Sequence, residues 1–361
     1  MQMIKNYFEK LFVILFTFIV CIIILEFGLR LLDRKPSNIT DGVHDQFENS
    51  YKLKANMKKT TNWPAFSYVN ITNSFGFRDK STGDRNIRNH PYYVFLGASE
   101  VYANGVNYED SFVGIVDQYA SKFGIEVLNM AIGGHRPVDQ EALFKHFLSN
   151  VPHGPDKVFF CLDALTIPIY NQRHDNILVK DGYVFEKDSW RSAYIRIMLG
   201  NISSAYCFFR DNFRKLQVKW VGKTEDKSPD FFKVFSKKNK IFQKETIKKF
   251  ENYLDRFKNY CLTNNITPIY VYMPLTDSYR LNDLLIQSGK DPEQYDVIFY
   301  EKLLKKYCEE RNIKFINLSP VLKREYDAGK EIRFDLDAHY NKYANRVIGE
   351  FLINEIFKDK N

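Results

Sequence analysis

Five short apolar segments, separated by helix-length stretches, constrain the fold of this 361-residue chain more than any other feature. They lie at 92–97, 125–129, 157–162, 267–273 and 313–318. Helices are expected at 110–122, 137–149, 240–263, 293–311 and 342–357. Apolar strands that alternate with helices belong to a parallel sheet covered on both faces. The pattern therefore predicts an α/β fold, a three-layer α/β/α domain with a five-stranded parallel sheet over 91–361.

An uncharged apolar run occupies residues 11–25, close to the N-terminus. At about 1.5 Å per residue it is shorter than a hydrocarbon core of about 30 Å, so a span must include the flanking residues as far as Leu32. No small-residue cleavage site follows the run, which favours an uncleaved signal-anchor over a signal peptide or a buried core helix. We expect residues 1–35 to be one transmembrane anchor, with the short tail inside and the larger C-terminal part extracytoplasmic.

Two further segments lie outside the alternating pattern. Residues 36–90 are polar, aromatic and rich in turn-forming residues, which predicts an extended lead-in that packs on the domain surface. Residues 165–240 carry no clear strand but include an aromatic, basic stretch, which predicts a helical insertion or lid beside the sheet. The expected organisation is an anchor, a lead-in, and one α/β domain with this insertion.

Composition excludes several classes of function. The chain has 52 Lys and Arg against 44 Asp and Glu, and the net charge of +8 suits attraction to anionic membranes or polymers. No nucleic-acid partner is therefore expected. The five cysteines form no C-x-x-C pair, so they indicate neither a zinc site nor a disulfide scaffold. The sequence is compatible with one disulfide bridge. No metal-ligand spacing or glycine-rich nucleotide motif occurs, and no metal or cofactor is expected.

A serine follows the first predicted strand. Ser99 lies in the sequence LGASE at 96–100, where the strand gives way to a helical region. Ligands of open parallel sheets bind at the carboxyl ends of the strands, so a hydroxyl there can act as an exposed nucleophile. The alternative is an ordinary helix N-cap.

A serine nucleophile needs a base, and two histidines are suitably placed. His135 follows the second strand, and His339 lies in a loop between the last strand and the last helix. Asp337 precedes His339 by two residues and can direct its carboxylate to the ring Nδ1, so that Nε2 faces the serine. The alternative is a surface Asp-x-His motif in which Asn341 caps the final helix.

Three segments in this order resemble conserved blocks of one family. Residues 95–106, FLGASEVYANGV, resemble block I of the SGNH (GDSL-type) hydrolases, with Ser99 at the nucleophile position. Residues 129–134, NMAIGG, resemble block II, in which Gly134 would supply an oxyanion N–H. Residues 337–339, DAH, resemble block V. The segment NSFGFRD at 73–79 is also similar to the one preceding block I in membrane-anchored bacterial members. The resemblance implies a flavodoxin-like SGNH fold.

The sequence departs from the family pattern after the third strand. Block III should place an asparagine there as the third oxyanion donor, but the chain has Asp163. Asp163 could orient Ser99 or a substrate hydroxyl, be kept protonated by burial, or cap a helix. His135, Asn171 or the insertion could supply the missing donor.

The resemblance implies Ser-His-Asp ester chemistry. Ser99 would attack the carbonyl carbon, His339 would accept its proton while Asp337 holds the ring, and the N–H groups of Ser99 and Gly134 would bind the oxyanion. We expect Ser99 Oγ within about 3.5 Å of His339 Nε2. The predicted function is an acyl or acetyl esterase acting on an envelope or extracellular glycan or lipid ester. The alternatives are an O-acyltransferase of a cell-envelope polysaccharide and a catalytically silent binding or scaffold domain.

Overall fold

The protein, described from a computed structural model, forms two compact units. The structure describes residues 2–32, 42–63, 65–174, 176–220, 229–335 and 337–358. The helical unit comprises Met1–Thr40 and Ser189–Asp226, and the sheet unit comprises Asp41–Asp188 and Lys227–Asn361. The lead-in thus belongs to the same compact unit as the α/β domain, whereas much of the insertion belongs with the N-terminal helix.

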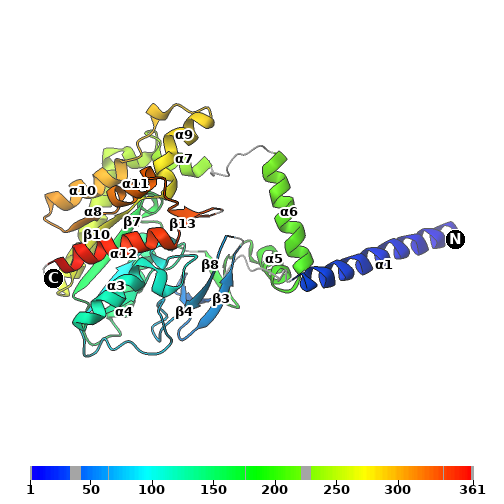
Figure 1. The fold of residues 1–361 in the computed structure, drawn as a ribbon, viewed down its shortest axis with the longest axis horizontal. Helices are drawn as coiled ribbons and strands as arrows, with labels where there is room; N and C mark the ends of the chain where they lie inside the picture. The colour runs from blue at the N-terminus through cyan, green and yellow to red at the C-terminus, as the bar shows by residue number, and fades with distance from the viewer. Residues whose placement is uncertain are drawn as a thin grey trace. The chain divides into compact units, whose positions relative to one another are not determined.

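A parallel sheet of five strands lies at the centre of the sheet unit (Figure 1). Its order is β11-β10-β7-β5-β6, and every neighbouring pair is parallel. The strands are β5 (Tyr92–Leu96), β6 (Glu126–Asn129), β7 (Lys157–Asp163), β10 (Thr267–Met273) and β11 (Phe315–Asn317). All five predicted strands are present. Their side chains are apolar on both faces because helices cover both faces of the sheet.

The predicted helices lie on the two faces. They are α3 (Phe112–Ala120), α4 (Pro137–Leu148), α8 (Lys244–Thr263), α10 (Phe299–Glu310) and α12 (Lys342–Phe357). Helices α3 and α12 pack together, whereas α4 contacts α8 on the opposite face, and α10 packs there against β10. Helix α8 buries Phe250, Leu254, Phe257 and Cys261 along one stripe, as its helical periodicity predicts. The three-layer prediction is confirmed.

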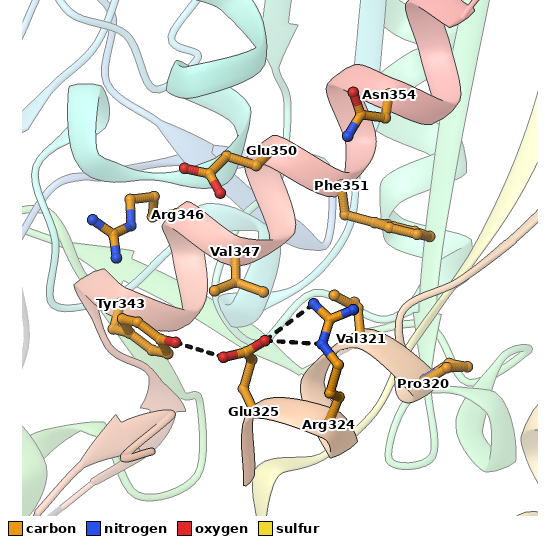
Figure 2. A pocket seen from close by; sticks show the side chains of 10 residues that line it. All are labelled: Pro320, Val321, Arg324, Glu325, Tyr343, Arg346, Val347, Glu350, Phe351 and Asn354. Carbon is orange, nitrogen blue, oxygen red and sulfur yellow. Dashed lines mark hydrogen bonds and ion pairs between the residues drawn. The ribbon is translucent and has the colours of Figure 1, made fainter. Parts of the chain in front are cut away.

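A groove on the outside of this domain lies between α11 (Ser319–Asp327) and α12 (Figure 2). Within it, Tyr343 donates a hydrogen bond of 2.5 Å to Glu325, which also pairs with Arg324 at 3.0 Å. None of the site residues predicted from the sequence lines this groove. The predicted chemistry therefore belongs elsewhere on the molecule.

The lead-in is more regular than predicted. It forms two antiparallel hairpins, β1 (His44–Phe47) with β2 (Ser50–Leu53) and β3 (Lys58–Asn62) with β4 (Ser67–Ile71). Alternate side chains of these strands, including Tyr51, Leu53 and Tyr68, are buried in the main core. The period-two alternation of these strands, which the sequence reading did not assign, lets them bury one face against the core.

The insertion also contains strands that the sequence reading missed. Strands β8 (Ile177–Lys180) and β9 (Tyr183–Glu186) form a hairpin, which corrects the expectation of no strand in 165–240. Asp181 and Gly182 form its turn with φ of 52° and 86°. An Asp-Gly pair between alternating apolar residues favours such a two-residue hairpin turn. The remainder is helical as predicted, with α5 (Trp190–Ile202), α6 (Ser204–Trp220) and α7 (Pro229–Phe235), and 221–228 lie outside the described residues.

The N-terminal helix α1 (Gln2–Leu31) belongs to the helical unit. Within the described parts of the chain, its segment Glu9–Leu31 is the one helix that is long and apolar enough to cross a membrane. Residues 33–41 lie outside the described residues, so the predicted boundary between anchor and lead-in falls there.

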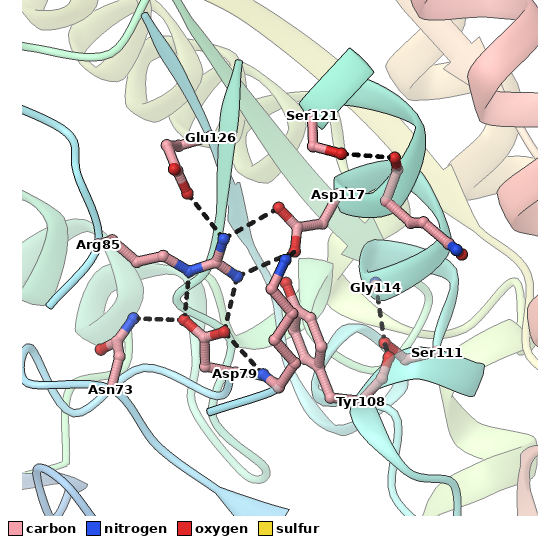
Figure 3. Close-up of polar contacts among 11 residues, drawn as sticks. Asn73, Asp79, Arg85, Tyr108, Ser111, Gly114, Asp117, Ser121 and Glu126 are labelled. Atoms are coloured by element: carbon pink, nitrogen blue, oxygen red, sulfur yellow. Dashed lines mark hydrogen bonds and ion pairs between the residues drawn. The ribbon is translucent and has the colours of Figure 1, made fainter. Parts of the chain in front are cut away.

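A buried ionic network joins the lead-in to α3 and β6 within the sheet unit (Figure 3). Arg85 donates from Nε and Nη2 to the two carboxylate oxygens of Asp79, both at 2.6 Å. It also pairs with Asp117 on α3 at 2.9 Å and with Glu126 on β6 at 2.7 Å. Charges removed from water are tolerated when they are paired in this way. Through Asp79, the network joins the segment NSFGFRD to α3 and to the start of β6.

Candidate active site

Ser99 lies on a tight turn between β5 and the short helix α2 (Ser99–Tyr102). The turn requires Gly97, because a Cβ there would lie 2.2 Å from Val101 Cγ2. Helix α2 ends at Ala103, which has a φ of 61°. The Ser99 hydroxyl donates a hydrogen bond of 3.0 Å to the carboxylate of Glu100.

Arg78 of the lead-in supports the far end of α2. Its buried guanidinium donates to the carbonyl oxygens of Tyr102, Ala103 and Val106, the bond to Ala103 being 2.6 Å. It also lies over the rings of Tyr68 and Tyr102, at 5.0 Å and 4.8 Å from their centroids. Because carbonyl oxygens at a helix end need donors, Arg78 stabilises the loop that carries Ser99.

His339 and Asp337 lie on β13 (Asp337–Tyr340), which pairs with β12 (Arg333–Phe334). The expected loop is therefore a short hairpin, with Leu336 outside the described residues. Asp337 Oδ1 lies 2.5 Å from His339 Nδ1 and also accepts the backbone N–H of His339 at 2.8 Å. The contact between Asp337 and this ring nitrogen is the one expected from the sequence.

These contacts determine how the pair titrates. Burial alone would lower the pKa of His339, but the hydrogen bond to Asp337 and the negative charges of Glu100 and Asp337 raise that pKa above its ordinary value. Burial alone would raise the pKa of Asp337, but its hydrogen bonds with His339 lower it. Asp337 therefore stays ionised and favours the protonated imidazole that a general base becomes.

The other ring nitrogen faces an amide. His339 Nε2 lies 3.5 Å from Asn104 Nδ2, in the loop that follows α2. Within the described part of the chain, the Ser99 hydroxyl donates to Glu100 and forms no hydrogen bond with His339. The expected approach of Ser99 Oγ to His339 Nε2 stays a prediction. A Cβ at Gly133 would lie 3.8 Å from both Ser99 Cβ and Asn104 Nδ2, so these groups converge on one point.

The Gly133–Gly134 peptide is held from the outside of the site. The Tyr51 hydroxyl of β2 donates a hydrogen bond of 2.9 Å to the Gly133 carbonyl oxygen. His174 Nε2 lies 3.2 Å from the next carbonyl oxygen, that of Gly134. Gly134 has a φ of 80°, and a Cβ there would lie 2.6 Å from the Tyr51 hydroxyl oxygen. In a planar trans peptide the Gly134 N–H points away from the Gly133 carbonyl, so Tyr51 sets its direction.

The asparagine of the second block links this loop to α2. Asn129 Nδ2 donates to the carbonyl oxygen of Val101 at 2.9 Å, and its Oδ1 accepts the N–H of Ala131 at 3.1 Å. A backbone hydrogen bond of 3.2 Å from the Ile132 N–H to the Gly97 carbonyl oxygen adds a second link. The turn of Ser99 and the loop of Gly134 are thus one connected framework.

The three auxiliary candidates lie in different environments. Asp163 ends β7 and accepts the N–H groups of Leu165 at 2.7 Å and Thr166 at 2.8 Å, in the turn that follows the strand. Burial, together with the charge of Glu100, raises the pKa of Asp163 above its ordinary range. His135 is buried with Nε2 2.8 Å from the carbonyl oxygen of Tyr51, and burial lowers its pKa to about 3. Asn171 is exposed in a turn.

Three residues at the site were not predicted from the sequence. Glu100 and Asn104 lie in the same sequence block as Ser99, FLGASEVYANGV, and this closeness in sequence is a signal for their proximity to Ser99. Tyr51 is separated from Gly133 by 82 residues and carries no local signal.

In the described ranges, no group of three or more His, Cys, Asp or Glu side chains is placed to hold a metal ion. The five cysteines all lie in described segments, and no disulfide bridge joins any two of them.

Comparisons with known proteins found similar solved structures but no similar sequence. No protein-family model matches the chain, and no curated protein matches its sequence. A lipolytic protein of the G-D-S-L family from Veillonella parvula matches with 15% identity and a TM-score of 0.41, covering 74% of this chain and 98% of that one. The chain is similar in structure to GDSL-type lipolytic proteins.

Two solved esterases give comparable matches. The esterase EstA of a Pseudoalteromonas species has 13% identity and a TM-score of 0.38, covering 75% of this chain and 98% of that one. A catalytic mutant of an acetylxylan esterase from Geobacillus stearothermophilus has 12% identity and a TM-score of 0.39, covering 74% and 96%.

Proposed function

We propose that the protein is a serine esterase in which Ser99, His339 and Asp337 act together. The observation that carries the proposal is the Asp337–His339 pair, whose Nε2 faces Asn104 in the segment that follows Ser99 at the carboxyl end of β5. A nucleophile, a base and a carboxylate that orients the base are the parts that acyl transfer requires. The adjacent Gly133–Gly134 peptide offers an N–H for the oxyanion.

The resting hydrogen bonds define the first step of the proposed reaction. The Ser99 hydroxyl turns from Glu100 toward His339, where Nε2 is the acceptor because Nδ1–H is directed to Asp337. As Ser99 Oγ bonds to the ester carbonyl carbon, its proton passes to Nε2. The carbonyl π electrons move to the oxygen and form the tetrahedral oxyanion.

The oxyanion then needs hydrogen-bond donors. Two are the backbone N–H groups of Ser99 and Gly134. We assign the third to Asn104, whose Nδ2 lies beside both His339 and the Gly133 backbone, in place of the asparagine absent after β7. The side-chain oxygen Oδ1 of Asn104 accepts a hydrogen bond of 3.3 Å from the Tyr68 hydroxyl, which orients the amide so that Nδ2 is directed to the site.

The remaining steps return the enzyme to its starting state. Protonated His339 gives its proton to the alkoxide oxygen as the C–O bond of the ester breaks and the alcohol leaves. Water then loses a proton to His339, attacks the acyl carbon, and the carboxylic acid leaves as Ser99 Oγ regains the proton. A sugar hydroxyl in place of water would make the protein an O-acyltransferase.

The proposed setting is the outer face of a membrane. Helix α1 would anchor the chain, and the net charge of +8 favours substrates on anionic surfaces, so an envelope or extracellular glycan or lipid ester is the proposed substrate. The second candidate function is a catalytically silent binding or scaffold domain. The hydrogen bond of Ser99 to Glu100, in place of His339, is the observation that favours it.

Turnover of p-nitrophenyl acetate by the full-length protein separates these functions. Hydrolysis that is lost in Ser99→Ala and in His339→Ala supports the esterase. The matched controls Ser288→Ala and His90→Ala replace an exposed serine and a half-buried histidine outside the site and should retain wild-type activity. Absence of turnover by the parent protein would favour the silent domain, and turnover that rises when a sugar acceptor is added would favour the acyltransferase.

A further inference from the structure

Within the helical unit, Glu26 of α1 binds the start of α6. Its carboxylate accepts the backbone N–H groups of Ser204 at 3.0 Å and Ala205 at 2.8 Å, and the Ser203 hydroxyl at 3.0 Å. Arg30 completes the cluster with an ion pair of 2.7 Å to Glu26. A carboxylate within an apolar helix is thus fully partnered, as ionisable groups near a bilayer need to be. The junction of α5 and α6 therefore lies beside the C-terminal end of the apolar run in α1 (Figure 1).

Both insertion helices expose large apolar side chains. On α5, Ile195, Leu199 and Ile202 are 59%, 39% and 63% exposed, and their spacing of four and three residues places them on one face. On α6, Phe209 and Phe213 are 56% and 68% exposed and lie one turn apart. Such a concentration of apolar surface on two adjacent helices marks an interaction surface.

The charge of the same helices is strongly positive. Residues 190–220 contain six basic side chains and one acidic side chain. The basic residues are Arg191, Arg196, Arg210, Arg214, Lys215 and Lys219, and the acidic residue is Asp211. Helices that combine an exposed apolar face with basic residues lie in the interface of anionic membranes.

We propose that α5 and α6 bind the surface of an anionic phospholipid bilayer, next to the point where α1 leaves it. The inference rests on the proposed membrane span of α1. Lipid is favoured over a second copy of the chain because the helices pack beside the apolar helix α1. The exposed side chains Phe27 and Leu31 of α1 flank Arg30, which donates to the Ile202 carbonyl oxygen at 2.7 Å at the end of α5. The net positive charge of residues 190–220 complements anionic headgroups.

Fluorescence from three labelled sites tests this arrangement. The full-length protein carries Cys21→Ala, which leaves its other four native cysteines buried, and one new thiol receives an environment-sensitive NBD label. The label is placed through Phe209→Cys on α6, through Ile14→Cys in α1, or through Ile286→Cys on α9 (Leu281–Gln287) of the sheet unit. Ile286 is 63% exposed and so matches Phe209. Each protein is reconstituted in vesicles of phosphatidylcholine and phosphatidylglycerol, with or without doxyl-labelled lipid.

The proposal predicts blue-shifted emission that doxyl lipid quenches at positions 14 and 209, and neither effect at 286. Quenching at 209 should fall in pure phosphatidylcholine, since each basic residue near an anionic surface favours binding by roughly five-fold. Quenching at 14 without quenching at 209 would overturn the inference and leave the anchor in place. A blue shift at 209 without quenching would show that protein covers the face, and absence of quenching at both positions would overturn the anchor as well.

Discussion

Removal of the Tyr51 hydroxyl tests the geometry of the oxyanion donor. In Tyr51→Phe the Gly133 carbonyl loses its hydrogen bond of 2.9 Å, and the Gly134 N–H loses the restraint on its direction. Burial raises the pKa of Tyr51, so its hydroxyl remains a donor across the working pH range. The lost hydrogen bond should lower the free energy of unfolding by about 1 kcal/mol. A complete loss of one oxyanion donor costs about 10²–10³ in kcat, and a misdirected N–H that keeps part of its interaction should cost roughly 10-fold or more.

Steady-state hydrolysis of p-nitrophenyl acetate, with urea unfolding of the same samples, measures both effects. We expect kcat to fall while KM changes little, because the interaction forms mainly in the transition state. Tyr92→Phe is the matched control, since the Tyr92 hydroxyl donates to the His153 carbonyl oxygen at 2.7 Å at the opposite end of β5. That variant should lose similar stability and keep its kcat. Equal kcat losses in the two variants, or wild-type kcat in Tyr51→Phe, would refute the positioning role.

Three further outcomes follow from the site. The value of kcat/KM should increase with pH as His339 loses its proton, with a midpoint above 6.5. In Glu100→Gln this midpoint should move to lower pH, because the variant lacks a negative charge that raises the pKa of His339. Asn104→Ala should reduce kcat by about 10²–10³ with little change in KM, and a change confined to KM would exclude it as an oxyanion donor. Arg78→Leu should lower the free energy of unfolding by about 3 kcal/mol or more in urea titration, because three carbonyl oxygens lose a charged donor, and an unchanged midpoint would contradict this role.

The sheet and its helices could be predicted because their signals are local. In the five apolar runs and in α12, the pattern of the nearest residues in the sequence is enough to predict which side chains are buried. Placement of Ser99 and His339 at the same edge of the sheet followed from the rule that parallel strands present their carboxyl ends together. The β8–β9 hairpin carried its local signal as well, in Asp181 and Gly182, and the reading missed it.

The supporting contacts of the site could not be predicted in this way. Tyr51 and Arg78 reach the site through space from the lead-in, and nothing in the neighbouring sequence specifies their partners. The direction of the Ser99 hydroxyl depends on one side-chain rotation, which periodicity and strand position do not determine. The position of Asn104 depends on the left-handed residue Ala103 that ends α2, another feature of the folded backbone.

The most direct measurement is the attachment point of a fluorophosphonate probe on the full-length protein, mapped by peptide mass spectrometry. The reactive hydroxyl is expected to be that of Ser99, with one adduct per chain and with labelling reduced to background in His339→Ala. An adduct on another residue, or undiminished labelling of Ser99 without His339, would contradict a mechanism in which this imidazole activates this serine.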